Sequence, residues 1–281
     1  MDYRPGISRE ELLSLVSGYD VLVVRSRTRV DRELIDRAAS LKLVARPGTG
    51  LDNIDVEYAR SRGIEVLNSP ESLVEAVAEH VVLLMLSLSR RVVEASLSTK
   101  SGLWEKERFT GYELRGKTLG IVGMGKIGRR VGELCSVFGM SILGYDVVPV
   151  PREVVEKLKC SIVDLDTLFS SSDYVTLHVP LTRETSRMVG KRLLSLMKSG
   201  SFLVNTSRGG VVDEAELAEA LKAGRIAGAG LDVFESEPPS GPILSAPNTV
   251  LTPHIGGQTV EAQSDAIRVV GRKIAEFFRA G

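Results

Sequence analysis

The stretch GKTLGIVGMGKIGRRVGELC (residues 116–135) decides the fold, because it joins an apolar strand pattern to a glycine-rich turn and the start of a helix. The turn carries the pattern G-x-G-x-x-G at Gly123, Gly125 and Gly128. In such a unit the first glycine permits a tight turn, the second lets the backbone approach a pyrophosphate, and the third lets helix and strand pack closely. The helix N-terminus then faces the anion. The stretch therefore predicts a dinucleotide-binding unit within a parallel sheet.

An acidic residue at the end of the next predicted strand, SILGYD (141–146), indicates which dinucleotide is bound. Asp146 stands where a carboxylate can accept hydrogen bonds from both ribose hydroxyls. Two valines follow it, and no arginine stands beside it to pair with a 2′-phosphate. The sequence thus favours NAD over NADP. A methyltransferase with a similar glycine loop is an alternative, although its usual cofactor would not explain the polar residues described below.

The composition favours a two-domain protein that binds small molecules. The chain has 281 residues, 43% of them hydrophobic, which is enough for two cores. Lys plus Arg equals Asp plus Glu at 36 each, so no charge surplus attracts nucleic acid or an anionic membrane. The apolar run at 81–88 is far shorter than the roughly 20 residues that span a bilayer. Two cysteines and no basic, apolar leader favour a soluble protein in a reducing cytoplasm. We expect no metal site in this sequence.

Short β-branched runs alternate with helical patterns along almost the whole chain, which is typical of parallel sheets with crossover helices. We expect an α/β protein. The predicted strands are 20–26, 41–46 and 63–68, then 118–123, 141–146, 160–163, 173–179, 201–207, 226–233 and 249–252. A helical period over 71–97 connects the two series, and an amphipathic helix is predicted at 259–280. The expected domains are a substrate domain (1–91 and 258–281) and a nucleotide domain (92–257).

The chain has three histidines, and His254 in VLTPHIGGQT (250–259) has the most suggestive position. A lone histidine beside a turn is usually structural. However, Arg208 in NTSRGGVVDEAEL, Asp232 and Glu237 in GLDVFESEPP, and His254 itself all follow predicted strands. In an open parallel sheet, ligands lie outside the carboxyl ends of the strands. We therefore expect these four side chains to project toward one crevice, to which the glycine loop also points.

Taken together, these motifs resemble those of the D-isomer-specific 2-hydroxyacid dehydrogenases. GMGKIG with Asp146, HVPLT, NTSRGGVVDE, AGLDVFESEPP and LTPHIGGQT occur in the family's order, and the resemblance runs from about Asp20 to the C-terminus. It implies two doubly wound parallel-sheet domains, a Rossmann-type NAD domain inserted in a smaller flavodoxin-like substrate domain. It also implies that Arg208, Glu237 and His254 are catalytic.

The chemistry suits these residue types. As a hydride moves between nicotinamide and a carbon bearing a hydroxyl, a proton must leave or reach the oxygen, and His254 can take or give it. Glu237 would accept a hydrogen bond from the other ring nitrogen and fix the tautomer. Arg208 offers a planar fork for the α-carboxylate of the substrate. By the resemblance, Asp232 anchors the nicotinamide carboxamide. The other residues that it assigns to the cofactor are Lys126, Ile127, Val179, Pro180, Thr206, Ser207 and Gly256.

The remaining two histidines are placed outside the chemistry. By the resemblance, His178 flanks the adenine side of the cofactor. His80 lies within the predicted connecting helix.

The substrate is expected to be chosen by two arginine-bearing loops, VRSRTRV (24–30) and VARPGTGLDNID (44–55). Arg25 and Arg46, with Thr49 and the backbone of Gly50, could bind the extra charge of a phosphorylated acid. These loops resemble the phosphoglycerate dehydrogenase branch of the family, with 3-phosphoglycerate as the preferred substrate at the entry to serine synthesis. Structural ion pairs of the two arginines are the alternative.

Other features leave the substrate open. Leu73 and Val74 stand where the phosphoglycerate branch usually has asparagine and serine, and they are closer to glyoxylate and hydroxypyruvate reductases. A non-enzymatic, NAD-sensing corepressor is a further alternative. The chain starts late relative to the family and would lack one strand and helix of the small domain, and no regulatory domain is expected after residue 281. Apolar residues beyond one face of the connecting helix predict a homodimer.

Overall fold

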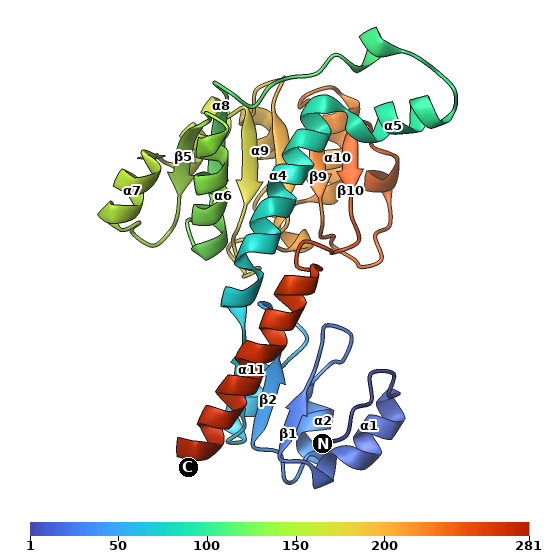
Figure 1. Ribbon diagram of the computed structural model, residues 1–281, viewed down its shortest axis with the longest axis vertical. Coiled ribbons are helices and arrows are strands. Elements are labelled where there is room, and N and C mark those ends of the chain that lie inside the picture. The colour runs from blue at the N-terminus through green and yellow to red at the C-terminus, as the bar shows by residue number, and fades with distance from the viewer. Residues whose placement is uncertain (281) are drawn as a thin grey trace. The chain divides into compact units, whose positions relative to one another are not determined.

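The computed structural model describes residues 1–280 and divides into two compact units. One unit comprises Met1–Val74 and the C-terminal segment from Gly257, and the other comprises Glu75–Gly256. Each unit contains its own parallel sheet flanked by helices (Figure 1), so the predicted α/β class is confirmed.

The larger unit is built on a seven-stranded sheet with the order β10-β9-β8-β7-β4-β5-β6, in which all pairs are parallel. The chain starts at β4, adds β5 and β6 on one side, and then returns to add β7 to β10 on the other. A topological switch therefore lies between β4 and β7, which is where such sheets bind ligands. The strands are β4 (Thr118–Val122), β5 (Ser141–Tyr145), β6 (Ser161–Ile162), β7 (Tyr174–Leu177), β8 (Phe202–Asn205), β9 (Gly228–Leu231) and β10 (Thr249–Leu251).

The carboxyl ends of six of these strands lie in register. The pairing aligns the last residues of the strands in a single row across the sheet: Tyr145, Val122, Leu177, Asn205, Leu231 and Leu251. The residue that follows each of them therefore begins a loop at the same edge. Asp146, Gly123, Thr206 and Asp232 are four of these residues, and all four were predicted to bind the cofactor.

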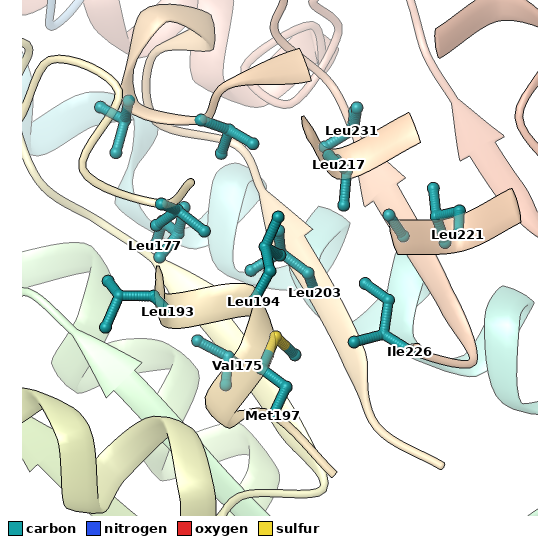
Figure 2. Packing of buried hydrophobic residues seen from close by; sticks show 14 of the residues in the cluster. Val175, Leu177, Leu193, Leu194, Met197, Leu203, Leu217, Leu221, Ile226 and Leu231 are labelled. Atoms are coloured by element: carbon teal, nitrogen blue, oxygen red, sulfur yellow. The ribbon is translucent and has the colours of Figure 1, made fainter. Parts of the chain in front are cut away.

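Two layers of helices cover this sheet. On one face, leucines of α8, α9 and α10 pack on Val175, Leu203 and neighbouring strand residues, as Figure 2 shows for α9 and α10. On the other face, Leu84 of α4 and Val131 of α6 join the second core cluster. The helices are α4 (Val74–Arg90), α6 (Lys126–Val137), α7 (Arg152–Leu158), α8 (Leu165–Ser171), α9 (Lys191–Leu196) and α10 (Glu214–Lys222). The short 3-10 turns are η3 (Lys106–Phe109), η4 (Gly209–Val211) and η5 (Pro242–Ser245).

The connecting helix differs from its prediction. The segment 71–97 is not one helix, because Arg91 adopts a left-handed conformation (φ 50°) between α4 and α5 (Val92–Lys100). The change of unit falls between Val74 and Glu75 instead of between residues 91 and 92, since α4 buries its apolar side chains in the core of the larger unit.

The apolar character of this region extends beyond the run at 81–88. By length and composition Pro70–Arg90 could cross a membrane, which the run alone did not indicate, but 56% of its apolar window is buried within the protein. A helix buried to this extent is typical of a protein core.

The smaller unit has a three-stranded parallel sheet in the order β1-β2-β3. Its core contains Leu34, Val44 and Ile64, and Asp31 and Asp55 cap α2 and α3 by accepting from backbone amides. The elements are α1 (Arg9–Leu15), η1 (Val16–Gly18), β1 (Val21–Val23), α2 (Arg32–Arg37), β2 (Leu43–Arg46), α3 (Val56–Ser61), β3 (Glu65–Asn68), η2 (Pro70–Leu73) and α11 (Val260–Ala280). All ten predicted strands and the C-terminal helix are present, whereas α1 had no prediction.

Candidate active site

The three glycines of the turn after β4 differ in why each position is occupied by glycine. Gly123 has φ 98°, and a β-carbon there would lie 2.5 Å from the carbonyl oxygen of His178. A β-carbon on Gly128 would lie 2.1 Å from the carbonyl oxygen of Gly123. By contrast, a β-carbon on Gly125 would meet no atom within 4 Å. The fold itself therefore excludes side chains at the first and third positions, while the second is open, as required where a pyrophosphate approaches the backbone.

Asp146 lies beside this turn. Its Oδ2 accepts from the amide of Met124 at 2.7 Å, and its Oδ1 accepts from the amide of Val148 at 3.0 Å. The carboxylate is thus fixed next to the glycine turn and remains partly exposed. This position fits the ribose contact predicted for it.

Other residues predicted to contact the cofactor lie at the same edge of the sheet. Lys126 and Pro180 are exposed, and Ile127 and Val179 are partly buried. Within residues 1–280, Thr206 Oγ1 is buried without a hydrogen-bond partner. A buried hydroxyl without a hydrogen-bond partner destabilises the fold unless a ligand or a water molecule provides the partner. The position of Thr206 therefore fits a binding site. NAD therefore suits the residues at this edge.

The loop that carries Arg208 is shaped by Asn205, the fully buried last residue of β8. The side-chain nitrogen Nδ2 of Asn205 donates to the carbonyl oxygen of Arg208 at 2.9 Å. Its Oδ1 accepts from the backbone amide and the hydroxyl of Ser207, at 3.0 and 2.8 Å. Nη1 of Arg208 donates to the carbonyl oxygen of Ser207 at 2.6 Å. The hydroxyl of Ser207 is therefore used within the loop, and the loop is held in one shape.

The predicted pair of Glu237 and His254 forms. Nδ1 of His254 lies 2.9 and 3.0 Å from the two carboxylate oxygens of Glu237, and the side chains are 50% and 43% exposed, respectively. Because the carboxylate accepts, Nδ1 carries the proton, and in the neutral ring Nε2 keeps its lone pair. The backbone of His254 is left-handed (φ 54°), and its amide donates to the carbonyl oxygen of Thr252 at 3.0 Å. The arrangement can take up a proton at Nε2.

Asp232 is almost completely buried, with 1% of its surface exposed. Its Oδ1 accepts from Thr252 Oγ1 at 2.6 Å and the amide of Ile255 at 2.8 Å, and its Oδ2 accepts from the amide of Gly256 at 2.7 Å. Burial raises the pKa of this carboxyl, but the nearby His80 and the hydrogen bonds from Thr252 and the two amides outweigh burial and lower the pKa below 3.8. The carboxylate therefore holds the loop on both sides of His254.

Gly256 has no room for a side chain, since a β-carbon would lie 2.9 Å from Asp232 Oδ2. Its place in this loop is set by contact with Asp232. The cofactor contact predicted for it stays a prediction.

The residues predicted to choose the substrate lie in the smaller unit. Arg25 is exposed at the end of β1, and the guanidinium of Arg46 donates to the carbonyl oxygen of Gly50. Asn53, which sequence reasoning missed, donates to the carbonyl oxygens of Arg25 and Thr28, at 3.1 and 2.6 Å. The two arginine-bearing loops are thus joined. Thr49 Oγ1 is buried without a hydrogen-bond partner among the described residues.

His178 follows β7, and its Nε2 lies 3.0 Å from Thr176 Oγ1. Burial lowers the pKa of this imidazole from 6.5 to about 3, so the ring is neutral near pH 7. Within residues 1–280 the structure has no cluster of three or more side chains suited to a metal ion.

Comparison with known proteins places the chain in a family. Residues 82–256 match the NAD binding domain of the D-isomer specific 2-hydroxyacid dehydrogenases. A D-3-phosphoglycerate dehydrogenase of Archaeoglobus fulgidus is 47% identical over 278 residues, which cover 98% of this chain and 52% of that protein. A hydroxypyruvate reductase of Thermotoga maritima is 45% identical over 274 residues, covering 96% of this chain and 87% of that protein.

The fold has equally clear relatives. The crystal structure of D-lactate dehydrogenase from Aquifex aeolicus, complexed with NAD and lactic acid, aligns with a TM-score of 0.85 and 33% identity over 96% of this chain and 85% of that chain. The chain therefore belongs to the D-isomer specific 2-hydroxyacid dehydrogenase family and contains its NAD binding domain. It spans about half the length of the phosphoglycerate dehydrogenases it matches. The predicted family and cofactor are confirmed.

Proposed function

We propose that this protein oxidises a D-2-hydroxy acid to the 2-keto acid with NAD, and that Arg208, Glu237 and His254 carry the reaction. The observation that carries the proposal is the pair of His254 Nδ1 and the Glu237 carboxylate at 2.9 Å. In this pair Nε2 of His254 is left as the proton acceptor. His254 lies on the loop that follows β10, the strand at the edge of the sheet beside β9.

Each group has one task. When bound, nicotinamide would supply the acceptor for the hydride that leaves C2 of the substrate. His254 Nε2 takes the hydroxyl proton, and Glu237 stabilises the imidazolium that forms. Arg208 binds the α-carboxylate through two parallel hydrogen bonds and so orients C2. In the reverse direction His254 returns the proton to the keto oxygen.

The cofactor would be held along the row of strand ends. The backbone of Gly125, Lys126 and Ile127 would hold the pyrophosphate, and Asp146 would accept hydrogen bonds from the ribose hydroxyls. Thr206 gains the hydrogen-bond partner that its hydroxyl lacks among the described residues. Asp232 would reach the carboxamide through Oδ2, which accepts one hydrogen bond in the structure. The remaining proposed contacts are Gly123, Gly128, Val179, Pro180, Ser207 and Gly256.

We further propose 3-phosphoglycerate as the substrate. Arg25 and Arg46 would supply positive charge to the phosphate, and Asn53 already joins their loops. Thr49 Oγ1 and the backbone of Gly50 would add hydrogen bonds to the same group. The relative from Archaeoglobus fulgidus, named a D-3-phosphoglycerate dehydrogenase, supports this choice.

A reductase of hydroxypyruvate or glyoxylate is the second candidate. Leu73 is apolar and stands at a position where the phosphoglycerate branch usually has a polar residue. Its side chain lies against Gly257, because a β-carbon on Gly257 would be 3.2 Å from Cδ1 of Leu73. The relatives named hydroxypyruvate reductase and glyoxylate reductase are 45% and 44% identical to this chain.

Absorbance at 340 nm with a panel of acids decides between them. The first candidate requires turnover of 3-phosphoglycerate, and faster turnover of glyoxylate would favour the second. Arg46→Ala should raise the KM for the phosphorylated acid far more than for glyoxylate, and equal effects would make the arginine structural. His254→Ala should lower kcat by roughly 10² to 10⁴ while NADH still binds. If NADH bound but no acid turned over, a nucleotide-sensing binding protein would be favoured.

We also propose a cytoplasmic homodimer. Apolar side chains stand out on α5 and the loop after it, with Trp104 86% exposed and Leu97 61% exposed. Exposed apolar patches of this kind mark protein interfaces. Light scattering should give twice the chain mass of 30.4 kDa, and a monomer at micromolar concentration would contradict the proposal.

A further inference from the structure

His80 lies on α4, away from the strand-end loops in sequence, yet it contacts two of them. Its side chain is 8% exposed, and Nε2 lies 3.0 Å from Thr252 Oγ1 and 3.4 Å from Asp232 Oδ1. Thr252 Oγ1 in turn lies 2.6 Å from Asp232 Oδ1. All three residues belong to the larger unit.

The direction of these hydrogen bonds follows from the acceptor at their end. An ionised Asp232 can only accept, so the Thr252 hydroxyl donates its proton to Oδ1. The lone pairs of that hydroxyl then face His80, so Nε2 of His80 carries a proton and donates. The result is a one-way chain from imidazole to hydroxyl to carboxylate, in which each bond strengthens the next.

The carboxylate at the end of this chain holds the loop of His254. Thr252 donates to it from one side of His254, and the amides of Ile255 and Gly256 donate from the other. His254 itself has a left-handed backbone, which is unfavourable for a residue with a side chain and persists only where the surroundings enforce it. The hydrogen bonds to Asp232 are the surroundings that do so.

We propose that His80 is a positioning residue for the proton-transferring imidazole of His254, acting through Thr252 and Asp232. This inference rests on the proposed role of His254 as the base. His80 fixes the rotamer of the Thr252 hydroxyl, and so keeps both oxygens of Asp232 aimed at the loop. A shift of about 1 Å in a reacting group can lower turnover 10²-fold, so a donor that does not touch the reacting atoms can control the rate.

The test uses variants that separate the hydrogen bond from packing. His80→Phe keeps a ring of similar size but cannot donate, whereas His80→Gln places an amide N–H near the position of Nε2. Thr252→Val removes the hydroxyl, and Thr252→Ser restores it. Val81→Ala is the matched control, because Val81 is a fully buried neighbour on α4 outside this chain of hydrogen bonds.

Two readouts are measured on the full-length protein: steady-state kinetics with NAD(H), and deuterium exchange at the amides of Ile255 and Gly256. We expect His80→Phe and Thr252→Val to lower kcat about 10- to 100-fold, to change KM for NADH less than kcat, and to speed exchange of both amides. His80→Gln and Thr252→Ser should recover most of each loss. Val81→Ala should lower the melting temperature while leaving kcat and loop exchange near wild type.

The outcomes separate this inference from the proposed function. A folded His80→Phe protein with wild-type kcat would overturn it, whether or not exchange changes. Equal losses in His80→Gln and His80→Phe, or in Val81→Ala, would also overturn it, because packing alone would explain them. If the wild type turned over none of the acids, the proposed function would fail, and unchanged exchange in His80→Phe would then refute the support of the loop on its own.

Discussion

Gly209 lies directly against the backbone of Phe234: a β-carbon on Gly209 would stand 1.9 Å from the carbonyl carbon of Phe234. Gly209 follows Arg208, and Phe234 precedes the segment that carries Glu237. Two loops from neighbouring strands therefore meet backbone to backbone, with no side chain between them. This contact fixes the position of the guanidinium loop relative to the carboxylate loop.

Replacing Gly209 by alanine should disrupt this contact, because no side-chain rotation can relieve a clash between backbones. We expect the free energy of unfolding to fall by ~2–4 kcal/mol and kcat to fall with it, measured by urea unfolding and by the 340 nm assay. Gly210→Ala is the control, since its β-carbon would meet only the side chain of Leu181, at 3.2 Å. Equal stability of the two variants would contradict the backbone contact.

Gly125→Ala should separate binding from folding. Because a β-carbon there meets no protein atom within 4 Å, the variant should be nearly as stable as the wild type. The same β-carbon would occupy space at the second glycine of the turn, so the Kd for NADH should rise at least about tenfold, as measured by fluorescence titration. Gly200→Ala, equally open, should change neither property. Unchanged NADH affinity in Gly125→Ala would show that the pyrophosphate binds elsewhere.

Asp146→Ser should relax the choice of cofactor. The substitution removes the carboxylate that would repel a 2′-phosphate, so the ratio of kcat/KM for NADH over NADPH should fall by about tenfold or more. Much of the loss should come from weaker NADH binding. A ratio that stays constant would mean that Asp146 serves only its two hydrogen bonds to Met124 and Val148.

His178 should make the protein lose stability in mild acid. Its pKa in the folded state is lowered to about 3, so between pH 6.5 and about 3 the unfolded chain binds a proton that the folded protein does not. Stability should therefore fall as the pH falls through this window, by at most ~1.4 kcal/mol per pH unit. Because His178 as a residue is only partly buried, we expect a smaller slope. His178→Gln should flatten the dependence of the urea midpoint on pH, whereas Thr176→Val, which keeps the imidazole, should not; identical slopes in all three proteins would disprove the assignment.

The sequence predicted the strands well because each is a short run bounded by turn residues and most contain β-branched residues. The register of a parallel sheet then places their ends together. The break at Arg91 was not predictable in the same way. No glycine or proline marks it, and the left-handed conformation occurs at an arginine within a pair of arginines. Likewise, the point at which the chain changes unit depends on which core α4 packs against, and its own apolar pattern does not state this.

In the site, too, residues with a local sequence signal were predicted, whereas residues whose contacts depend on the folded chain were not. Arg208, Glu237 and His254 stand in motifs with strong local signals, and the pair of Glu237 and His254 forms as expected. His80 gave no such signal, because its partner Thr252 lies 172 residues away and only the folded chain brings them together. Asn205 and Asn53 were missed for a related reason: they bind backbone carbonyl groups, which any sequence provides. Asp232 appeared in the prediction as a cofactor contact, and its hydrogen bonds to the loop of His254 emerge only from the structure.

The alignment of strand ends also bears on how such an enzyme can acquire new specificity. The residues proposed to bind the cofactor, to recognise the carboxylate and to transfer the proton lie in separate segments of the sequence, which begin at one edge of the sheet. Insertions or exchanges in one segment can therefore alter one step of the reaction while the neighbouring segments keep their geometry, provided that the close backbone contact at Gly209 is left intact.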